Sequence, residues 1–135
     1  MRRALALAVL TAFAAAGAAQ AENWTKYVDT SAGLSWSIDN DYTYRDRQSG
    51  RIVVMQAVSK GTTGPGLPGE ADGVGSVVAL DCDKKNMITL SGFKPGQPLA
   101  IKGNWRADTP KKAEGADNAA LLNLVCPKAS TYPVK

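Results

Sequence analysis

The chain contains no histidine and only two cysteines among its 135 residues. Without histidine it cannot form the Ser-His or Cys-His pairs that activate many enzyme nucleophiles. Catalytic zinc sites rely on histidine almost everywhere, and two cysteines cannot complete a four-cysteine structural zinc site. We therefore expect no catalytic residue, no metal and no cofactor, and the sequence predicts a protein that is not an enzyme.

Long apolar runs are also scarce, and the one clear run lies at the N-terminus. Arg2 and Arg3 precede an apolar stretch from Ala4 to Ala16, and Ala19-Gln20-Ala21 has the small-x-small pattern of a cleavage site. This three-part pattern is that of a secretory signal peptide. No later segment has the length and apolarity of a membrane span, and no cysteine stands at the cleavage point to carry a lipid. We predict a signal peptide over residues 1–21, cleaved after Ala21, and a periplasmic or secreted protein of a Gram-negative bacterium.

The remaining residues, 22–135, fit a single domain of 114 residues. Removing Arg2 and Arg3 from the count leaves 14 basic and 12 acidic residues, a net charge of +2. The charges are interspersed, with no long basic block. This pattern predicts that the protein binds neither nucleic acid nor a membrane surface.

The two cysteines are predicted to form a structural disulfide. Cys82 follows the apolar run Val77 to Leu80, and Cys126 closes a helix-like segment that begins at Ala119. In an exported chain an even pair of cysteines usually forms a disulfide, and the spacing is not the C-x-x-C of a redox centre. The Cys82–Cys126 bridge would then pin a helix to a strand.

Most of the domain is predicted to form β-strands. The alternation of apolar and polar residues over Leu34 to Asp39 is typical of a half-buried strand. The run from Arg51 to Ser59 is apolar on both faces at its centre, which favours a central position in the sheet. Gln48-Ser49-Gly50 predicts the hairpin turn before it. The predicted strands are Trp24 to Thr30, Leu34 to Asp39, Tyr42 to Asp46, Arg51 to Ser59, Val77 to Asp83, Asn86 to Gly92 and Leu99 to Gly103.

The C-terminal part predicts one amphipathic helix. Thr109-Pro110 resembles a helix start, but Gly115 interrupts the pattern, so we expect the regular helix from about Ala116. Its apolar stripe includes Leu121, Leu122 and Val125 at helical spacing. Pro127 ends it, and the tail from residue 128 to 135 is expected to be loose.

Together these elements predict an α+β fold. It consists of a mainly antiparallel sheet of about six strands, with one C-terminal helix packed on one face and tethered by the disulfide. The helix is too short to cover such a sheet, so we expect the other face or an edge to be polar or covered by a second copy in a homodimer. The glycine- and proline-rich segment from Lys60 to Gly75 is predicted to be a loop, either functional or a tolerated insertion.

Two kinds of side chain are candidates for function. Asp39 with Asp41, and Asp81 with Asp83, are carboxylate pairs that could share a proton or bind calcium, although a solvated turn explains their spacing better. Lys84-Lys85, between two strands, is a candidate partner-binding site or simply a charged hairpin tip.

The order of these features resembles the bacterial surface-adhesin protein E family, and the resemblance covers nearly all of residues 22–135. Its motifs are Trp24-Thr-Lys-Tyr27-Val28, Trp36-Ser-Ile38-Asp39 followed by Tyr44-Arg45, the strand Ile52 to Ala57, Leu80-Asp-Cys82-Asp-Lys-Lys85, Trp105, and the helix Leu121 to Cys126. The resemblance implies a six-stranded antiparallel sheet with a disulfide-tied C-terminal helix, dimerisation through the sheet, and adhesion to host extracellular-matrix proteins.

We therefore predict a secreted, non-catalytic binding protein with a protein partner, of which a host matrix protein is the candidate. The alternative is a small periplasmic enzyme or enzyme-inhibitor module that uses the carboxylates of Asp39, Asp41, Asp81 and Asp83.

Overall fold

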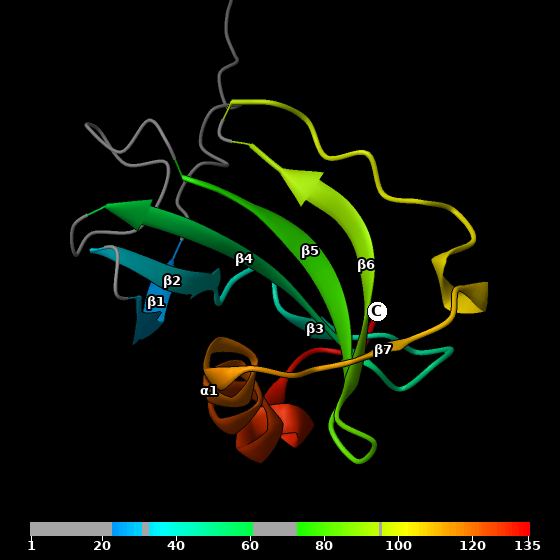
Figure 1. The fold of residues 1–135 in the computed structure, drawn as a ribbon. Coiled ribbons are helices and arrows are strands. Elements are labelled where there is room, and N and C mark those ends of the chain that lie inside the picture. The colour runs from blue at the N-terminus through cyan, green and yellow to red at the C-terminus, as the bar shows by residue number, and fades with distance from the viewer. Residues whose placement is uncertain (1–22, 31–32, 61–72, 95) are drawn as a thin grey trace, which may run out of the picture.

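The structure is a computed structural model that describes residues 23–30, 33–60, 73–94 and 96–135. Its core is an antiparallel sheet with the helix α1 (Ala116–Val125) on one side and a long connection on the other (Figure 1). The predicted fold, an antiparallel sheet with a C-terminal helix and a disulfide, is confirmed. The predicted signal peptide and residues 61–72 of the predicted loop lie outside the described residues.

The sheet has seven strands in the order β1-β2-β4-β5-β6-β7, and β3 also pairs with β4. Two short 3-10 helices, η2 and η3, flank β7 and α1 in the second half of the chain. The strands are β1 (Trp24–Asp29), β2 (Leu34–Asp39), β3 (Tyr44–Arg45), β4 (Ile52–Lys60), β5 (Val74–Asp81), β6 (Asn86–Phe93) and β7 (Lys111–Lys112), and the 3-10 helices are η2 (Trp105–Ala107) and η3 (Cys126–Thr131).

Strand β4 is central, as its composition predicts. It pairs with β2 and β3 in different parts of its length and with β5 along most of it. Val53 and Met55 face one layer of the core, whereas Ile52 and Val54 face the layer that contains the helix. The hairpin turn predicted before β4 is also present, and Gly50 there has φ +76°, a conformation that glycine adopts without steric cost.

The helix layer forms the first half of the core. Leu121 and Val125 of α1 are fully buried, and Leu122 is nearly so. They pack against Ile52 and Leu80 of the sheet in a single apolar cluster. The helix begins at Ala116, as predicted, because Gly115 has φ +95° and so cannot belong to a right-handed helix.

The second face of the sheet is apolar, and the chain itself covers it. The segment after β6 runs back on the side of the sheet away from α1 (Figure 1). Trp105 of η2, which is 4% exposed, packs in the apolar cluster of this second face. Trp24 and Tyr44 pack against the same cluster. The expectation that this face would be polar or need a second copy is therefore wrong, because residues after β6 form a second covering layer.

The disulfide joins the two ends that the sequence predicted. Cys82 directly follows β5 and Cys126 directly follows α1, and their Cα atoms are 5.7 Å apart. This distance is ordinary for a disulfide. The bridge therefore ties the end of the helix to the end of a core strand.

Several predicted boundaries differ from the structure. The third predicted strand shortens to Tyr44–Arg45, and β4 and β5 extend into the predicted loop as far as Lys60 and Val74. The strand predicted at residues 99–103 is absent: Ile101 is 39% exposed, so this segment does not bury alternate side chains as a strand would. Thr109 does not start a helix, because the two residues after Pro110 pair with β6 as β7.

The C-terminal tail is ordered, contrary to prediction. After η3, the N–H of Lys135 donates to the carbonyl of Arg45 at 3.0 Å, and the N–H of Arg45 donates to the carbonyl of Pro133 at 2.8 Å. The N–H of Arg47 donates to the carbonyl of Lys135 at 2.8 Å. These backbone hydrogen bonds attach the tail to β3, and the sequence of the tail alone carries no sign of this pairing.

Candidate functional site: a basic edge of the sheet

The candidate partner-binding residues Lys84 and Lys85 lie in the turn between β5 and β6, and both are exposed. A carboxylate oxygen of Asp81 accepts hydrogen bonds from the N–H groups of Asp83 at 3.0 Å and Lys84 at 2.9 Å. The N–H of Lys85 donates to the carbonyl of Asp81 at 2.8 Å, and Lys85 has φ +55°. Asp81 therefore fixes the backbone that presents both lysines.

Strand β7 brings two further lysines to the same place. Lys112 pairs with Asn86, and Lys111 pairs with Met87, so β7 lies along the outer side of β6. The N–H of Ala113 donates to the carbonyl of Lys85 at 2.9 Å, which ties β7 to the turn. We call the four exposed residues Lys84, Lys85, Lys111 and Lys112 the lysine edge.

The ammonium groups of the lysine edge have no hydrogen bond or ion pair with any residue that the structure describes. Four unpaired positive charges on a backbone fixed by strand pairing attract carboxylate-rich partners, and salt screens that attraction. The lysine edge is therefore a candidate interaction surface.

A groove of about 340 Å³ continues along β6 from the lysine edge. Thr89 of β6 lines it beside Lys111 of β7. On its far side lie Lys102 and Asp108, whose side chains form an ion pair at 2.5 Å. Among the described residues, β7 pairs with β6 only at Asn86 and Met87, and the N–H of Lys102 donates to the carbonyl of Leu90 at 3.1 Å, so the groove borders β6 between these two attachments.

The candidate carboxylates are engaged in turns. The N–H of Asp41 donates to the carboxylate of Asp39 at 2.9 Å, in the arrangement that Asp83 and Asp81 repeat. Each D-x-D spacing therefore forms a local turn, in which the first side chain caps the backbone. Burial raises the pKa of Asp39 despite these hydrogen bonds, because the side chain is 6% exposed and a carboxylate loses its hydration there. The cavity that Asp81 and Asp83 line does not include Asp39 or Asp41.

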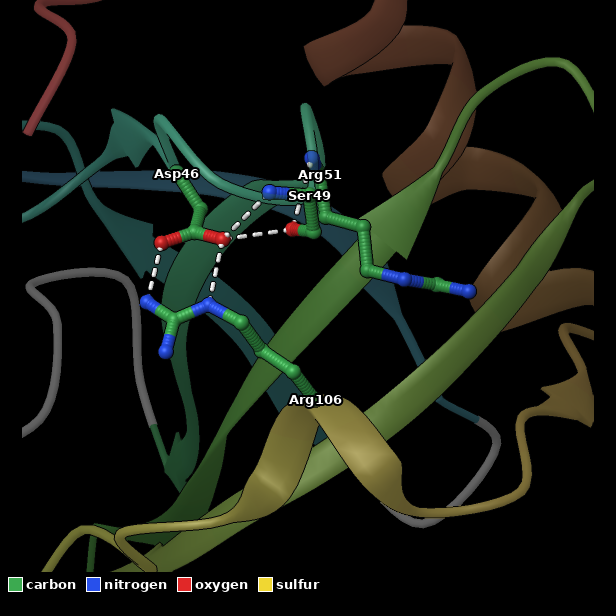
Figure 2. A network of polar contacts seen from close by, with 4 residues as sticks. All are labelled: Asp46, Ser49, Arg51 and Arg106. Atoms are coloured by element: carbon green, nitrogen blue, oxygen red, sulfur yellow. Dashed lines mark hydrogen bonds and ion pairs between the residues drawn. The ribbon is translucent and has the colours of Figure 1, made fainter.

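An ion pair between the buried Asp46 and the exposed Arg106, which the sequence did not suggest, fastens the second covering layer to the sheet. Asp46, which is 2% exposed, accepts hydrogen bonds from two nitrogens of Arg106, at 2.5 and 2.8 Å (Figure 2). The N–H and hydroxyl of Ser49 donate to the same carboxylate at 2.9 and 2.6 Å. The guanidinium of Arg106 beside it, aided by Ser49, holds the pKa of Asp46 well below its usual range. A carboxylate so fully paired is a structural anion and not a general base.

Partner binding by Lys84 and Lys85 stays a prediction, and the structure shows which residues lie beside them. Lys84 and Lys85 are surface residues, as the sequence suggested, and Lys111 and Lys112 join them through β7. The sequence missed the second pair because both lysines were assigned to the approach to a helix. Strand β7 consists of two exposed lysines, so it has no alternation of apolar and polar residues from which a strand could be predicted.

No metal-binding cluster of three or more histidine, cysteine or acidic residues occurs among the described residues. In the same part of the chain no helix is both long enough and apolar enough to cross a membrane.

Comparisons with known proteins find no relative. The chain matches no protein-family model, and no curated protein and no solved structure is significantly similar to it. The resemblance to the surface-adhesin protein E family therefore rests on the order of its motifs and stays a prediction.

Proposed function

We propose that this chain is an exported, non-catalytic binding protein and that its lysine edge binds an acidic segment of a protein partner. The observation that carries the proposal is the set of four lysines on one corner of the sheet whose ammonium groups have no partner among the described residues. Lysine side chains held at the edge of a rigid sheet lose less freedom on binding than side chains of a loose loop. Complementary charge then increases the association rate and selects acidic partners.

Export is supported by the N-terminal signal-peptide pattern and by the disulfide. Disulfides such as Cys82–Cys126 persist in the periplasm and outside the cell and are rare in the reducing cytosol. The motif order that resembles surface adhesins supports a host extracellular-matrix protein as the partner. We therefore propose adhesion to such a protein as the specific form of the binding function.

Solid-phase binding to immobilised laminin and vitronectin tests this function. The wild-type protein is compared with the double variant Lys84→Glu/Lys111→Glu and with the control Lys94→Glu/Lys128→Glu. Both variants change the net charge equally, but the control lysines are exposed residues outside the lysine edge. We expect saturable wild-type binding, at least roughly tenfold weaker binding by the first variant, and near wild-type binding by the control.

Equal loss in both variants would show that net charge alone causes binding and would contradict a role for the lysine edge. Absence of saturable wild-type binding to either matrix protein would reject the adhesive form of the proposal.

A further inference from the structure

A second site lies at the opposite side of the β5–β6 turn from β7. It is a cavity of about 410 Å³ between the β3–β4 hairpin, the end of β5 and η3. The strand register places Arg45, Ile52 and Leu80 side by side in one row across β3, β4 and β5. Paired residues in adjacent strands point to the same face, so Arg45 lies on the face that α1 covers. Ile52 and Leu80 lie beneath the cavity and are only 2% and 1% exposed, so its accessible lining comes from the residues around them.

The walls of the cavity are fixed by covalent and backbone bonds. Cys82 lines it, and the disulfide to Cys126 holds the start of η3 beside the end of β5. Ser130 of η3 forms part of the opposite wall, and the hydrogen bonds between the tail and Arg45 hold the far end of that wall. A cavity with such walls is formed before any ligand arrives, which reduces the entropic cost of binding.

Two of the four charged residues in the lining have side chains without a hydrogen-bond or ion-pair partner among the described residues. The guanidinium of Arg51 donates to the side-chain oxygen of Asn86 at 2.9 Å, and Asp81 caps the turn. By contrast, the charged groups of Arg45 and Asp83 are exposed and have no hydrogen bond or ion pair with the residues that the structure describes. The cavity therefore offers one free cation on the hairpin and one free anion on the β5–β6 turn.

This balance of charge selects among ligand classes. A purely anionic ligand would meet the carboxylates of Asp81 and Asp83, and a purely cationic ligand would meet Arg45 and Arg51. A ligand with both charges can satisfy the two free groups at once. The volume of the cavity is in the range of small-ligand pockets.

We propose that this cavity binds short peptides with free ends, with the carboxylate on Arg45 and the ammonium group on Asp83. Arg45 suits the carboxylate because a guanidinium can donate two parallel hydrogen bonds to it. The proposal adds a small-ligand site to the proposed binding function and does not depend on the lysine edge.

Titration of the exported protein with the tripeptide Ala-Leu-Ala, followed by amide NMR shifts, tests the site. We expect saturable shifts at Gly50, Ile52 and Ser130, and at least tenfold weaker binding by the C-terminal amide and by the N-acetyl analogue. Absence of saturable shifts, shifts centred away from this cavity, or equal affinity for the free and blocked peptides would overturn the proposal.

Three variants assign the two charged ends. In Arg45→Gln the free peptide and its amide should bind equally, whereas Arg47→Gln, a neighbouring exposed arginine outside the lining, should keep the tenfold preference. In Asp83→Asn the free and N-acetyl peptides should bind equally. Persistence of either preference in its variant would contradict the assigned role. Lys84→Glu/Lys111→Glu should bind the tripeptide like the wild type. The proposed peptide site and the proposed role of the lysine edge are therefore tested independently.

Discussion

Asp46 is a buried charge that connects two parts of the molecule far apart in the sequence. Its carboxylate joins the turn before β4 to η2, 60 residues later, through Arg106. Trp105, the neighbour of Arg106, fills the second face of the sheet, and the guanidinium of Arg106 lies 4.6 Å from the centre of its ring. The Asp46 carboxylate is 2% exposed and the Arg106 side chain 37%. Loss of the guanidinium would therefore leave a buried carboxylate without its counter-ion, which costs more than the pair contributes when intact. The covering layer therefore depends on this carboxylate.

Asp46→Asn should lower the melting temperature by roughly 5–15 °C at pH 7. The amide of asparagine can still accept from Ser49, but it carries no charge for Arg106. A lost hydrogen bond to a charged group costs ~1.5–3 kcal/mol, and each kcal/mol shifts the melting temperature of a domain of this size by roughly 3–5 °C. Asp41→Asn, an exposed carboxylate in the preceding turn, should change it by less than about 2 °C. Equal effects in the two variants, measured by thermal denaturation, would contradict this role of Asp46.

The contribution of Asp46 should also depend on pH in one direction. Its pKa is lower in the folded protein than in the unfolded chain, where an aspartate titrates near ~3.9. The stabilisation is therefore complete above the unfolded pKa and is lost as the pH falls through the folded pKa. We expect the gap in unfolding free energy between wild type and Asp46→Asn to be constant from about pH 5 to 7 and to narrow below about pH 4. Denaturant titrations at each pH measure it, and a gap that widens in acid would be inconsistent with a lowered pKa.

At the scale of elements, α1 and η3 depend on a tether. Only Leu121, Leu122 and Val125 of α1 are buried, so the helix has a small apolar face with which to offset the entropy of its own ordering. The disulfide at Cys126 closes a long loop and contributes about 4 kcal/mol in the loop-entropy description. The sheet beneath is held by many more contacts, with β4 at its centre.

Cys126→Ser should free the helix before it opens the sheet. We expect amide hydrogen exchange to rise first over residues 116–125, while residues 52–58 of β4 keep their protection. Cys82→Ser/Cys126→Ser serves as the control for mispairing of the remaining thiol and should give the same pattern. If the β4 amides exchange as early as those of the helix, the tether holds the whole domain, and the separate role of α1 is wrong.

The elements that were predicted correctly have a recognisable pattern of apolar and polar residues within their own sequence. Leu34–Asp39 alternates and was predicted to its ends, and β4 was placed at the centre because both of its faces are apolar. The disulfide was predicted because the chain is expected to be exported. The start of α1 was predicted from Gly115. Residues 111–112 and the C-terminal tail have no such pattern, because their structure comes from partners on β6 and β3. For the same reason the sequence did not predict that Lys111 and Lys112 belong to the lysine edge. It also did not predict the contacts of Asp46 with Arg106 and Ser49.

At the scale of the whole molecule, both faces of the sheet are covered within one chain, so its edges remain for contacts between molecules. The β6 side carries the lysine edge, which repels a second copy of itself. Strand β1 pairs with β2 on one side, and none of the described strands pairs with its other side. An unpaired strand edge can add a strand from another chain.

The predicted homodimer should therefore form through β1. Sedimentation at tens of micromolar should show a dimer, in line with an interface of standard size. Amide exchange over residues 24–29 should slow as the protein concentration rises, and exchange over residues 86–93 should not change. A monomer at all these concentrations, or slowing at β6 in place of β1, would contradict an edge dimer of this kind.

The central claim is that the protein binds its partner at the lysine edge, and site-specific photocrosslinking tests it most directly. A benzophenone amino acid is placed at Thr89, which is exposed and lines the groove beside β7, or at Lys26, which is exposed on β1. With the matrix protein that binds in the solid-phase assay, we predict a light-dependent adduct from position 89 and none from position 26. The adduct from position 89 should disappear when Lys84→Glu/Lys111→Glu is added. An adduct from position 26 alone, or one from position 89 that persists after the charge reversal, would contradict the account.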